Sequence, residues 1–246
     1  MAANVIDDLE AEQLRLESVL SRLVPADWLA PSAAAGWTIA DVALHLAQTD
    51  EAVAATVHGD GNAIEWQRLG STVDEAMAAL VAADRTDPAV VFDRWRAARR
   101  ACVEALRAAD PGQPVRWVTN WIKPRTLATT RLAEHWAHAL DIATPLGIDY
   151  PDTMRLRHIA WLGHSTLPYA FRLTGLPTVP VFCDLTAPDG SSWQFGDPAA
   201  ENVIAGDAGA FCRVGAQRLD PEASGLQTKG PYAAEALRVL RNYAAV

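Results

Sequence analysis

Hydrophobic positions in the first part of the chain recur every three or four residues, which is the spacing of one face of a helix. This pattern begins between residues 5 and 24, where the intervening positions are acidic or polar. Four further segments have helical spacing or an alanine-rich helical composition: 38–57, 72–83, 87–109 and 126–144. Helices that follow one another through short connections predict an antiparallel four-helix-type bundle over residues 1–148.

The start and the end of this bundle region carry local signals. Thr38 is a typical capping residue, and Asp41, three positions later, brings a negative charge to the positive end of the second predicted helix. Pro145 and Gly147 follow the last predicted helix of the bundle. Since proline and glycine commonly end helices, the bundle is expected to finish near this point.

The pattern changes after residue 148. Residues 149–175 predict one more helical segment, which connects to a region of short β-like runs separated by turns. The runs predict three strands, and two further segments predict helices: strands over 179–186, 192–195 and 202–205, and helices over 207–217 and 231–243. Asp207 can cap the first of these two helices. We therefore expect residues 149–246 to form a small α+β domain with a mostly antiparallel sheet, so that the chain is an α+β protein of two domains.

Composition and charge exclude several classes of protein. The chain has 246 residues, of which 50% are hydrophobic and 21% are charged, so it can bury a core and is not expected to be disordered. The formal net charge of -9 argues against nonspecific binding to nucleic acid or to an anionic membrane, since both need clustered cations. The basic run 94–100 is expected to be a solvated helix face.

The expected location is the cytoplasm. The three cysteines are widely spaced and form no disulfide framework or metal motif, which suits a reducing compartment. The first eight residues are acidic and lack the apolar core of a secretory signal. The apolar runs are shorter than the roughly 18 residues that a membrane span needs.

Histidine placement points to chemistry. Glu134 and His138 are four positions apart and therefore share one face of a predicted helix, where they can chelate one cation. His45, in the middle of another predicted helix, is the natural third ligand. Two imidazoles and one carboxylate suit a divalent transition metal such as Zn²⁺, with a coordination position left open. Spacing alone leaves two alternatives: His135 can replace Glu134 beside His138, or a buried histidine can simply be bonded to a carboxylate.

Three polar residues lie near these candidate ligands. Asp141 follows His138 by three positions and can orient it from behind, although an exposed polar position is the alternative. Gln48 and Thr49 lie one turn beyond His45 and can line the same cavity, with ordinary helix-surface polarity as the alternative.

Two segments resemble a known family. Residues 36–47, which contain the pattern Trp-Thr-x-x-Asp-x-x-x-His, resemble the second helix of the DinB-like metal-binding bundles and, more narrowly, of the mycothiol-dependent maleylpyruvate isomerase family. Residues 134–142 resemble the Glu-x-x-x-His-x-x-Asp segment of the same family. The resemblance implies that His45, Glu134 and His138 are the metal ligands and that His135 is not one. Less sharply, residues 193–197 and 211–212 resemble the family's small sterol-carrier-like C-terminal domain.

The resemblance also implies an activity. The family uses a low-molecular-weight thiol such as mycothiol, and a bound metal ion favours the nucleophilic thiolate. We expect isomerisation of a small electrophile, or transfer of the thiol to it, with Arg218 as the candidate group that binds negative charge on the substrate. The alternatives are a non-enzymatic protein that binds a metal and a ligand, and a metal-dependent hydrolase. The metal, the thiol, the substrate and the oligomeric state are left open.

Overall fold

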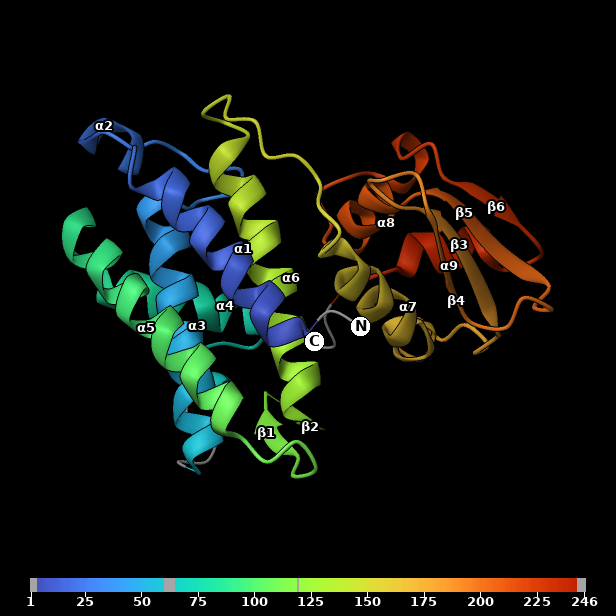
Figure 1. Ribbon diagram of the computed structural model, residues 1–246, viewed down its shortest axis with the longest axis horizontal. Helices are drawn as coiled ribbons and strands as arrows, with labels where there is room; N and C mark the ends of the chain where they lie inside the picture. Colours follow the sequence, from blue (N-terminus) through green and yellow to red (C-terminus); the bar gives the residue numbers. More distant parts are fainter. Residues whose placement is uncertain (1–3, 60–64, 119, 243–246) are drawn as a thin grey trace. The chain divides into compact units, whose positions relative to one another are not determined.

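The computed structural model describes residues 4–59, 65–118 and 120–242. The chain divides into two compact units, the first ending at Tyr150 and the second beginning at Pro151. The first unit is helical and the second combines helices with a sheet, as Figure 1 shows. This agrees with the α+β class that the sequence predicts.

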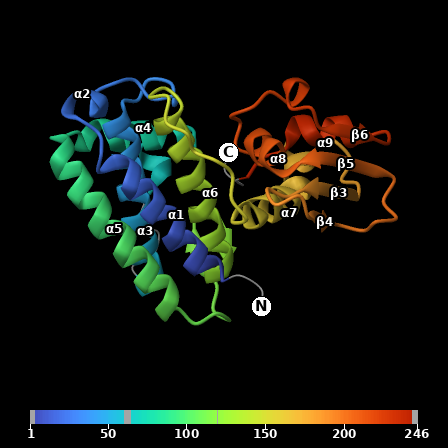
Figure 2. The ribbon, with the colours of Figure 1, turned by 45° about the horizontal axis from the view of Figure 1, so that its top comes forward.

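Four long helices make the bundle of the first unit (Figures 1 and 2): α1 (Val5–Leu20), α3 (Ile39–His58), α5 (Pro88–Ala108) and α6 (Pro124–Ala143). Helices α1 and α3 each contact both α5 and α6, so the four helices surround one core. Shorter elements complete the described part of this unit: α2 (Pro25–Trp28), a 3-10 turn (Trp66–Arg68), α4 (Val73–Asp84), β1 (Val115–Trp117) and β2 (Asn120–Ile122). Strands β1 and β2 form an antiparallel hairpin that the sequence analysis did not predict.

Helix α3 is the most deeply buried of these helices, and its start is fixed locally. Thr38 Oγ1 accepts a hydrogen bond from the backbone N–H of Asp41, and Asp41 Oδ2 accepts one from the N–H of Thr38. This reciprocal capping satisfies two N–H groups that the helix itself leaves without partners. The predicted role of Thr38 as a cap is confirmed.

Helix α1 is shorter than predicted. The expected helix ran to residue 24, but α1 ends at Leu20. Val24 has extended backbone angles, and Pro25 begins α2. A residue before proline is disfavoured in the helical region because the proline ring crowds it, so a continuous helix cannot pass through this point.

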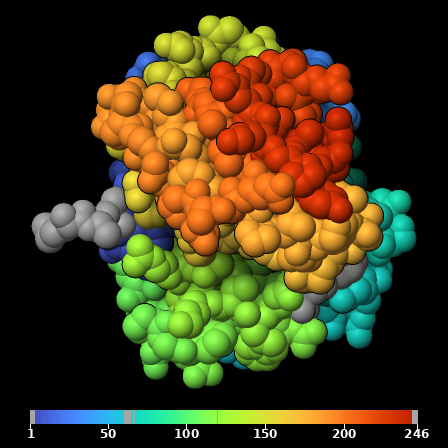
Figure 3. Space-filling model, turned by 90° about the vertical axis from the view of Figure 1, so that its right-hand side faces the viewer, coloured from blue at the N-terminus to red at the C-terminus, as the bar shows by residue number. Residues whose placement is uncertain are grey.

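The second unit contains a four-stranded sheet in the order β4-β3-β5-β6: β3 (Val181–Thr186), β4 (Ser192–Phe195), β5 (Asn202–Asp207) and β6 (Gln227–Lys229). The pairs β3–β4 and β5–β6 are antiparallel, whereas the central pair β3–β5 is parallel. Figure 3 shows the surface of the second unit in orange and red. The sequence analysis predicted the first three strands and missed β6.

Helices pack against this sheet: α7 (Leu156–Leu173), α8 (Ala208–Gly215) and α9 (Ala233–Val239), with a 3-10 turn at Pro221–Ala223. Asp207 caps α8 by accepting a hydrogen bond from the N–H of Ala210, as its position predicts. Each helix is shorter than expected, and α7 begins only at Leu156. Before it, the Asp152 carboxylate accepts two hydrogen bonds from Arg213, which holds this stretch against α8.

The predicted cytoplasmic location depended on the cysteines and on the length of the apolar segments. Cys102, Cys183 and Cys212 are all buried free thiols. In the described part of the chain, every helix is too short or too polar to cross a bilayer. The cytoplasmic location stays a prediction.

Candidate metal centre

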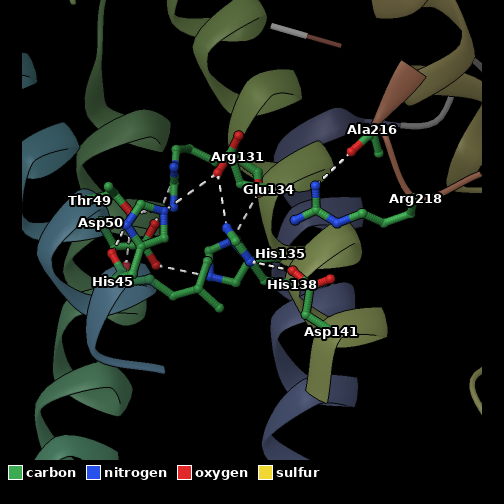
Figure 4. A network of polar contacts seen from close by, with 11 residues as sticks. His45, Thr49, Asp50, Arg131, Glu134, His135, His138, Asp141, Ala216 and Arg218 are labelled. Atoms are coloured by element: carbon green, nitrogen blue, oxygen red, sulfur yellow. Dashed lines mark hydrogen bonds and ion pairs between the residues drawn. The ribbon is translucent and has the colours of Figure 1, made fainter. Parts of the chain in front are cut away.

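Three side chains converge where α3 faces α6. Glu134 Oε2 lies 3.7 Å from His45 Nε2 and 3.5 Å from His138 Nε2. One donor atom from each residue lies within 4.8 Å of the other two. Figure 4 labels the three side chains. We call His45, Glu134 and His138 the triad.

The triad has the dimensions of a site for one small divalent cation. Zinc binds nitrogen and oxygen at about 2.0–2.2 Å, so two ligands at a tetrahedral angle lie roughly 3.3–3.5 Å apart. The two distances from Glu134 are 3.7 and 3.5 Å, close to this range. The donor set and its spacing therefore fit Zn²⁺ or a similar ion, and metal binding itself stays a prediction.

The triad is buried on its histidine side and open on its glutamate side. The side chains of His45 and His138 are 7% and 11% exposed, whereas that of Glu134 is 34% exposed. An ion held by three such side chains keeps at least one position for another ligand, which is the arrangement of catalytic rather than structural zinc sites.

Asp141 holds the imidazole of His138 from behind. Its carboxylate is buried, and Oδ2 lies 2.9 Å from His138 Nδ1. Because Nδ1–H donates this hydrogen bond, the lone pair of the neutral ring is on Nε2, the atom that faces Glu134. Asp141 thus occupies the orienting position that the sequence analysis proposed for it.

Burial and neighbouring charges set the protonation states. Burial lowers the pKa of His45 to about 4, so this ring is neutral at pH 7. Burial opposes charge on His138 too, but the hydrogen bonds with Asp141 and Glu134 outweigh it and raise its pKa. For Glu134 burial favours the neutral acid, yet the hydrogen bonds with the two histidines hold its pKa well below the usual value. A neutral His45 and an ionised Glu134 are the forms that bind metals.

Trp37 forms a wall beside the two imidazoles. Its ring centre lies 5.1 Å from that of His45 and 6.3 Å from that of His138. Trp37 immediately precedes Thr38, so the capping of α3 also positions the indole. The sequence analysis quoted Trp37 as part of a motif but gave it no role. An aromatic residue directly before a helix cap, eight positions from a candidate ligand, is the signal that was available.

His135 belongs to a second group, which explains why it lies apart from the triad. Its Nδ1–H donates to the backbone oxygen of Arg131 at 2.9 Å, and its Nε2 lies 3.2 Å from Asp50 Oδ2. Arg131 Nε donates to the other oxygen of Asp50 at 3.0 Å. We call Asp50, Arg131 and His135 the Asp50 cluster (Figure 4). Both nitrogens of His135 face partners in this cluster, so the choice that spacing left open favours Glu134.

Sequence reasoning missed Arg131 and Asp50. Arg131 is three positions before Glu134, on the same helix face, and Asp50 is five positions after His45. A charged residue on a helix face that is otherwise apolar is rarely buried without a partner. The two unmatched charges, one on each helix, were therefore a usable signal.

The two polar residues one turn beyond His45 differ. Thr49 is buried, and its hydroxyl donates to the backbone oxygen of His45 and accepts from Arg131 Nη2, both at 2.8 Å. Gln48 Nε2 donates to Leu80 and Asp84 of α4, both at 3.0 Å. These contacts connect Gln48 to α4 and Thr49 to the Asp50 cluster, and a role in lining a cavity stays a prediction for both.

Arg218 lies in the second unit, in the turn that follows α8. Its Nη1 donates to the backbone oxygen of Ala216 at 2.7 Å. A second arginine of this region, Arg213 of α8, forms a two-bond ion pair with Asp152, at 2.7 and 2.8 Å. Substrate binding by Arg218 stays a prediction.

Comparison with known proteins identifies the family. Residues 9–143, more than half of the chain, match the family profile described as "Mycothiol maleylpyruvate isomerase N-terminal domain". The chain belongs to this family. Two relatives, "Uncharacterized protein MT0041" and "Uncharacterized protein Rv0036c" of two strains of Mycobacterium tuberculosis, are each 36% identical to this mycothiol maleylpyruvate isomerase family member over 221 residues. Each match covers 87% of this chain and 84% of the relative.

Solved structures of the same fold exist. The "Crystal structure of the mycothiol-dependent maleylpyruvate isomerase" is similar to this family member with a TM-score of 0.64 and 17% identity, over 91% of both chains. A crystal structure of a mutant of a mycothiol-dependent maleylpyruvate isomerase gives a TM-score of 0.62 and 14% identity over the same shares. At such identity the likeness establishes the fold, and the predicted resemblance to this family is confirmed.

Proposed function

We propose that this chain is a metal-dependent enzyme that uses a low-molecular-weight thiol, of the mycothiol type, to isomerise a small electrophilic substrate. The observation that carries the proposal is the convergence of His45, Glu134 and His138 at one point, with Glu134 a third exposed. Membership of the mycothiol maleylpyruvate isomerase family supports both the thiol and the reaction class.

The triad would hold the cation, and Asp141 would keep His138 Nε2 directed at it. A divalent cation such as Zn²⁺, when bound, favours the ionised form of a thiol whose ordinary pKa is about 8.5, and so supplies thiolate near neutral pH. Trp37 packs beside both imidazoles of the triad. The exposed edge of Glu134 marks the side from which the thiol and the substrate approach.

The reaction is reversible addition of the thiolate to an alkene conjugated with a carbonyl group. The sulfur forms a bond to the β-carbon, and the π electrons of the alkene move to the carbonyl oxygen. The former double bond is now single and rotates from cis to trans. The electrons then return, the sulfur–carbon bond breaks, and the trans alkene and the thiolate are released. If the α-carbon takes a proton before this return, the product is instead the stable thioether, which is S-transfer.

Arg218 is our candidate for binding negative charge on the substrate. A guanidinium can pair with a carboxylate through two parallel hydrogen bonds, which orients a small acid. Arg218→Lys is expected to raise KM more than it lowers kcat, because lysine keeps the charge and loses the two-bond geometry.

The test measures thiol and substrate together. Zinc-loaded protein is mixed with mycothiol and a cis enone carboxylate, and both the isomer ratio and the free thiol are followed in time. Isomerisation without loss of thiol supports the proposed isomerase, and equal loss of thiol and substrate supports the S-transfer variant. His45→Ala is expected to abolish either reaction. His58→Ala, an exposed histidine at the end of the same helix, is the matched control and is expected to react normally.

Three outcomes contradict the proposal. Equal rates of reaction with zinc-loaded and chelator-treated protein would show that the metal has no part in the reaction. Turnover of an ester or amide without any thiol would favour the metal-dependent hydrolase. Tight binding of zinc with no reaction in a panel of electrophiles would favour the non-enzymatic binding protein.

A further inference from the structure

The Asp50 cluster lies one helical turn from the triad on both helices that carry the triad. On α3, Thr49 and Asp50 follow His45 by four and five positions; on α6, Arg131 precedes Glu134 by three. Because these residues face each other in opposite chain order, α3 and α6 run antiparallel here. Any shift of α6 along α3 would therefore change the cluster and the triad together.

Asp50 contacts each of the other three long helices. Its Oδ2 accepts from Gln13 Nε2 of α1 at 3.2 Å, and its Oδ1 accepts from Arg131 of α6. On α5, burial and then the charge of the Asp50 carboxylate raise the pKa of the Cys102 thiol well above its usual value. Asp50 is fully buried, so these contacts fix its position within the bundle.

Arg131 connects this fixed point to the backbone that carries His45. Its guanidinium donates from Nε to Asp50 and from Nη2 to Thr49 Oγ1, which are consecutive residues of α3. The Thr49 hydroxyl in turn donates a hydrogen bond to the backbone oxygen of His45, one turn earlier. An unbroken chain of hydrogen bonds thus runs from α6 to the turn of α3 that holds the first triad histidine.

A buried ion pair of this kind is better explained by geometry than by stability. Removing two charges from water is costly, and well-packed apolar residues of similar size often stabilise a core equally well. A planar guanidinium, by contrast, has donors in fixed directions, so it can donate to Asp50 and Thr49 at once only when α3 and α6 have one relative position. The cluster therefore selects one register of α6 against α3 among those that apolar packing would tolerate.

We propose that Arg131, held by Asp50, is a positioning residue that sets the gap between His45 and the Glu134–His138 pair. This inference rests on the proposed function, because it concerns the geometry of the same metal site. Arg131 is not one of the three candidate ligands. It acts through Thr49 on α3 and through the register of its own helix.

The test compares Arg131→Met with Arg99→Met. Arg99 is also a buried arginine of the bundle, so the expected solvated face over 94–100 is wrong at this position. It pairs with Glu17 of α1 and lies outside the triad and the Asp50 cluster. For each variant we would measure the zinc dissociation constant by chelator competition and the urea midpoint of the metal-free protein. Arg131→Met is expected to weaken zinc binding about 10- to 100-fold, which is typical for loss of a group that orients ligands. Arg99→Met is expected to stay within about threefold of wild type although both variants lose stability.

A conservative variant separates position from charge. Arg131→Lys keeps the cation but lacks the planar fork that reaches Asp50 and Thr49 at once. We expect its urea midpoint to lie nearer to wild type than that of Arg131→Met, with zinc binding still weakened about tenfold or more. The absorption spectrum of the Co²⁺ form should also differ from that of wild type in band position, because the ligand geometry has changed.

A second pair keeps the inference testable if Arg131→Met does not fold. Thr49→Val removes only the hydroxyl that connects Arg131 to His45, and Thr56→Val makes the same change farther along α3. Thr49→Val is expected to weaken zinc binding roughly three- to tenfold and Thr56→Val to leave it unchanged. Wild-type zinc affinity in Thr49→Val and Arg131→Lys would overturn the positioning role while leaving the proposed function intact. A wild-type protein that binds no zinc would overturn both.

Discussion

The triad and the Asp50 cluster lie one turn apart between the same two helices, and both combine histidine with a carboxylate. The triad joins two imidazoles to one carboxylate that is 34% exposed, and none of its three side chains is a permanent cation. The Asp50 cluster contains its own cation, Arg131, and its side chains are at most 2% exposed. The first group has a donor set that fits a cation, and cation binding there stays a prediction. The second group already contains its own cation.

This difference teaches that residue type alone does not separate a binding site from a structural one. His135 and His138 are both on α6 and both face carboxylates. What distinguishes them is where the second ring nitrogen and the surrounding charge lie. His138 Nε2 faces Glu134, whose side chain is 34% exposed, whereas His135 Nε2 faces the buried carboxylate that Arg131 already neutralises.

The largest expected effect is a loss of stability when the Asp50 cluster is broken. Asp50→Ala leaves the buried guanidinium of Arg131 without its carboxylate, and loss of one partner of a buried ion pair typically costs about 3–5 kcal/mol. We expect a fall of about 4 kcal/mol in the free energy of unfolding, measured by urea denaturation. Asp93→Ala, at a carboxylate that is 80% exposed, is the control and should change little. Equal stability of Asp50→Ala and wild type would mean that the cluster is not a structural ion pair.

The next largest effect is a difference in zinc affinity between variants of the two histidines of α6, His135 and His138. His138→Ala removes a proposed ligand and is expected to weaken zinc binding on the order of 100-fold or more, about 3 kcal/mol. His135→Ala should lower the urea midpoint and leave most of the zinc affinity. Chelator competition on both variants measures this. If His135→Ala lost the metal and His138→Ala kept it, the comparison between the two groups would be reversed.

A smaller effect concerns the partner of His138. Asp141→Asn removes the carboxylate that holds Nδ1–H, and we expect zinc affinity to fall about tenfold at neutral pH. In wild type the pKa of His138 is raised by its hydrogen bonds with Asp141 and Glu134, so zinc must displace a proton below that pKa. Affinity therefore increases with pH until His138 is neutral, and the variant should reach its plateau at lower pH. An unchanged pH profile in Asp141→Asn would contradict this pairing.

The smallest effect comes from an aspartate of α3 whose partner is exposed. Asp41 pairs with Arg85, whose side chain is 54% exposed, and caps the helix with Thr38. Asp41→Asn should lower the free energy of unfolding by about 1 kcal/mol, because the amide still accepts from Thr38 but lacks the charge that pairs with Arg85 and suits the start of the helix. Burial opposes the charge on Asp41, but Arg85 and Thr38 hold its pKa below 3.8. The loss should thus be constant near neutral pH and should disappear as the pH falls below about 4, because the unfolded chain binds the proton first. A loss that grew below pH 4 in urea titrations would contradict this.

The parts of the structure that local signals determine were predictable from the sequence. The cap at Thr38, the cap at Asp207 and the shared face of Glu134 and His138 each depend on residues within four positions of one another. The matching segments 36–47 and 134–142 also brought in the family, which the comparisons confirm. The helices of the bundle were predictable for the same reason, because helical periodicity is a pattern of residues three or four positions apart.

The parts that depend on distant residues were not predictable. Spacing could not choose between Glu134 and His135, because the choice depends on Asp50, a residue of another helix. Strand β6 consists of three exposed residues, Gln227–Lys229, and has no apolar alternation to mark it. Strand β5 pairs in parallel with β3, although β4 lies between them in the chain. Strands β3 and β5 are therefore not joined by a short turn that the sequence could reveal.

X-ray absorption of the zinc-loaded protein, before and after addition of a thiol, tests the central claim most directly. The account predicts one zinc per chain with two imidazoles and light oxygen or nitrogen ligands, and a new sulfur neighbour at about 2.3 Å once the thiol is present. The His138→Ala protein should lose this signal, and the His135→Ala protein should keep it. A zinc ion whose ligands stay the same after thiol addition, or a signal that survives in His138→Ala, would contradict the account.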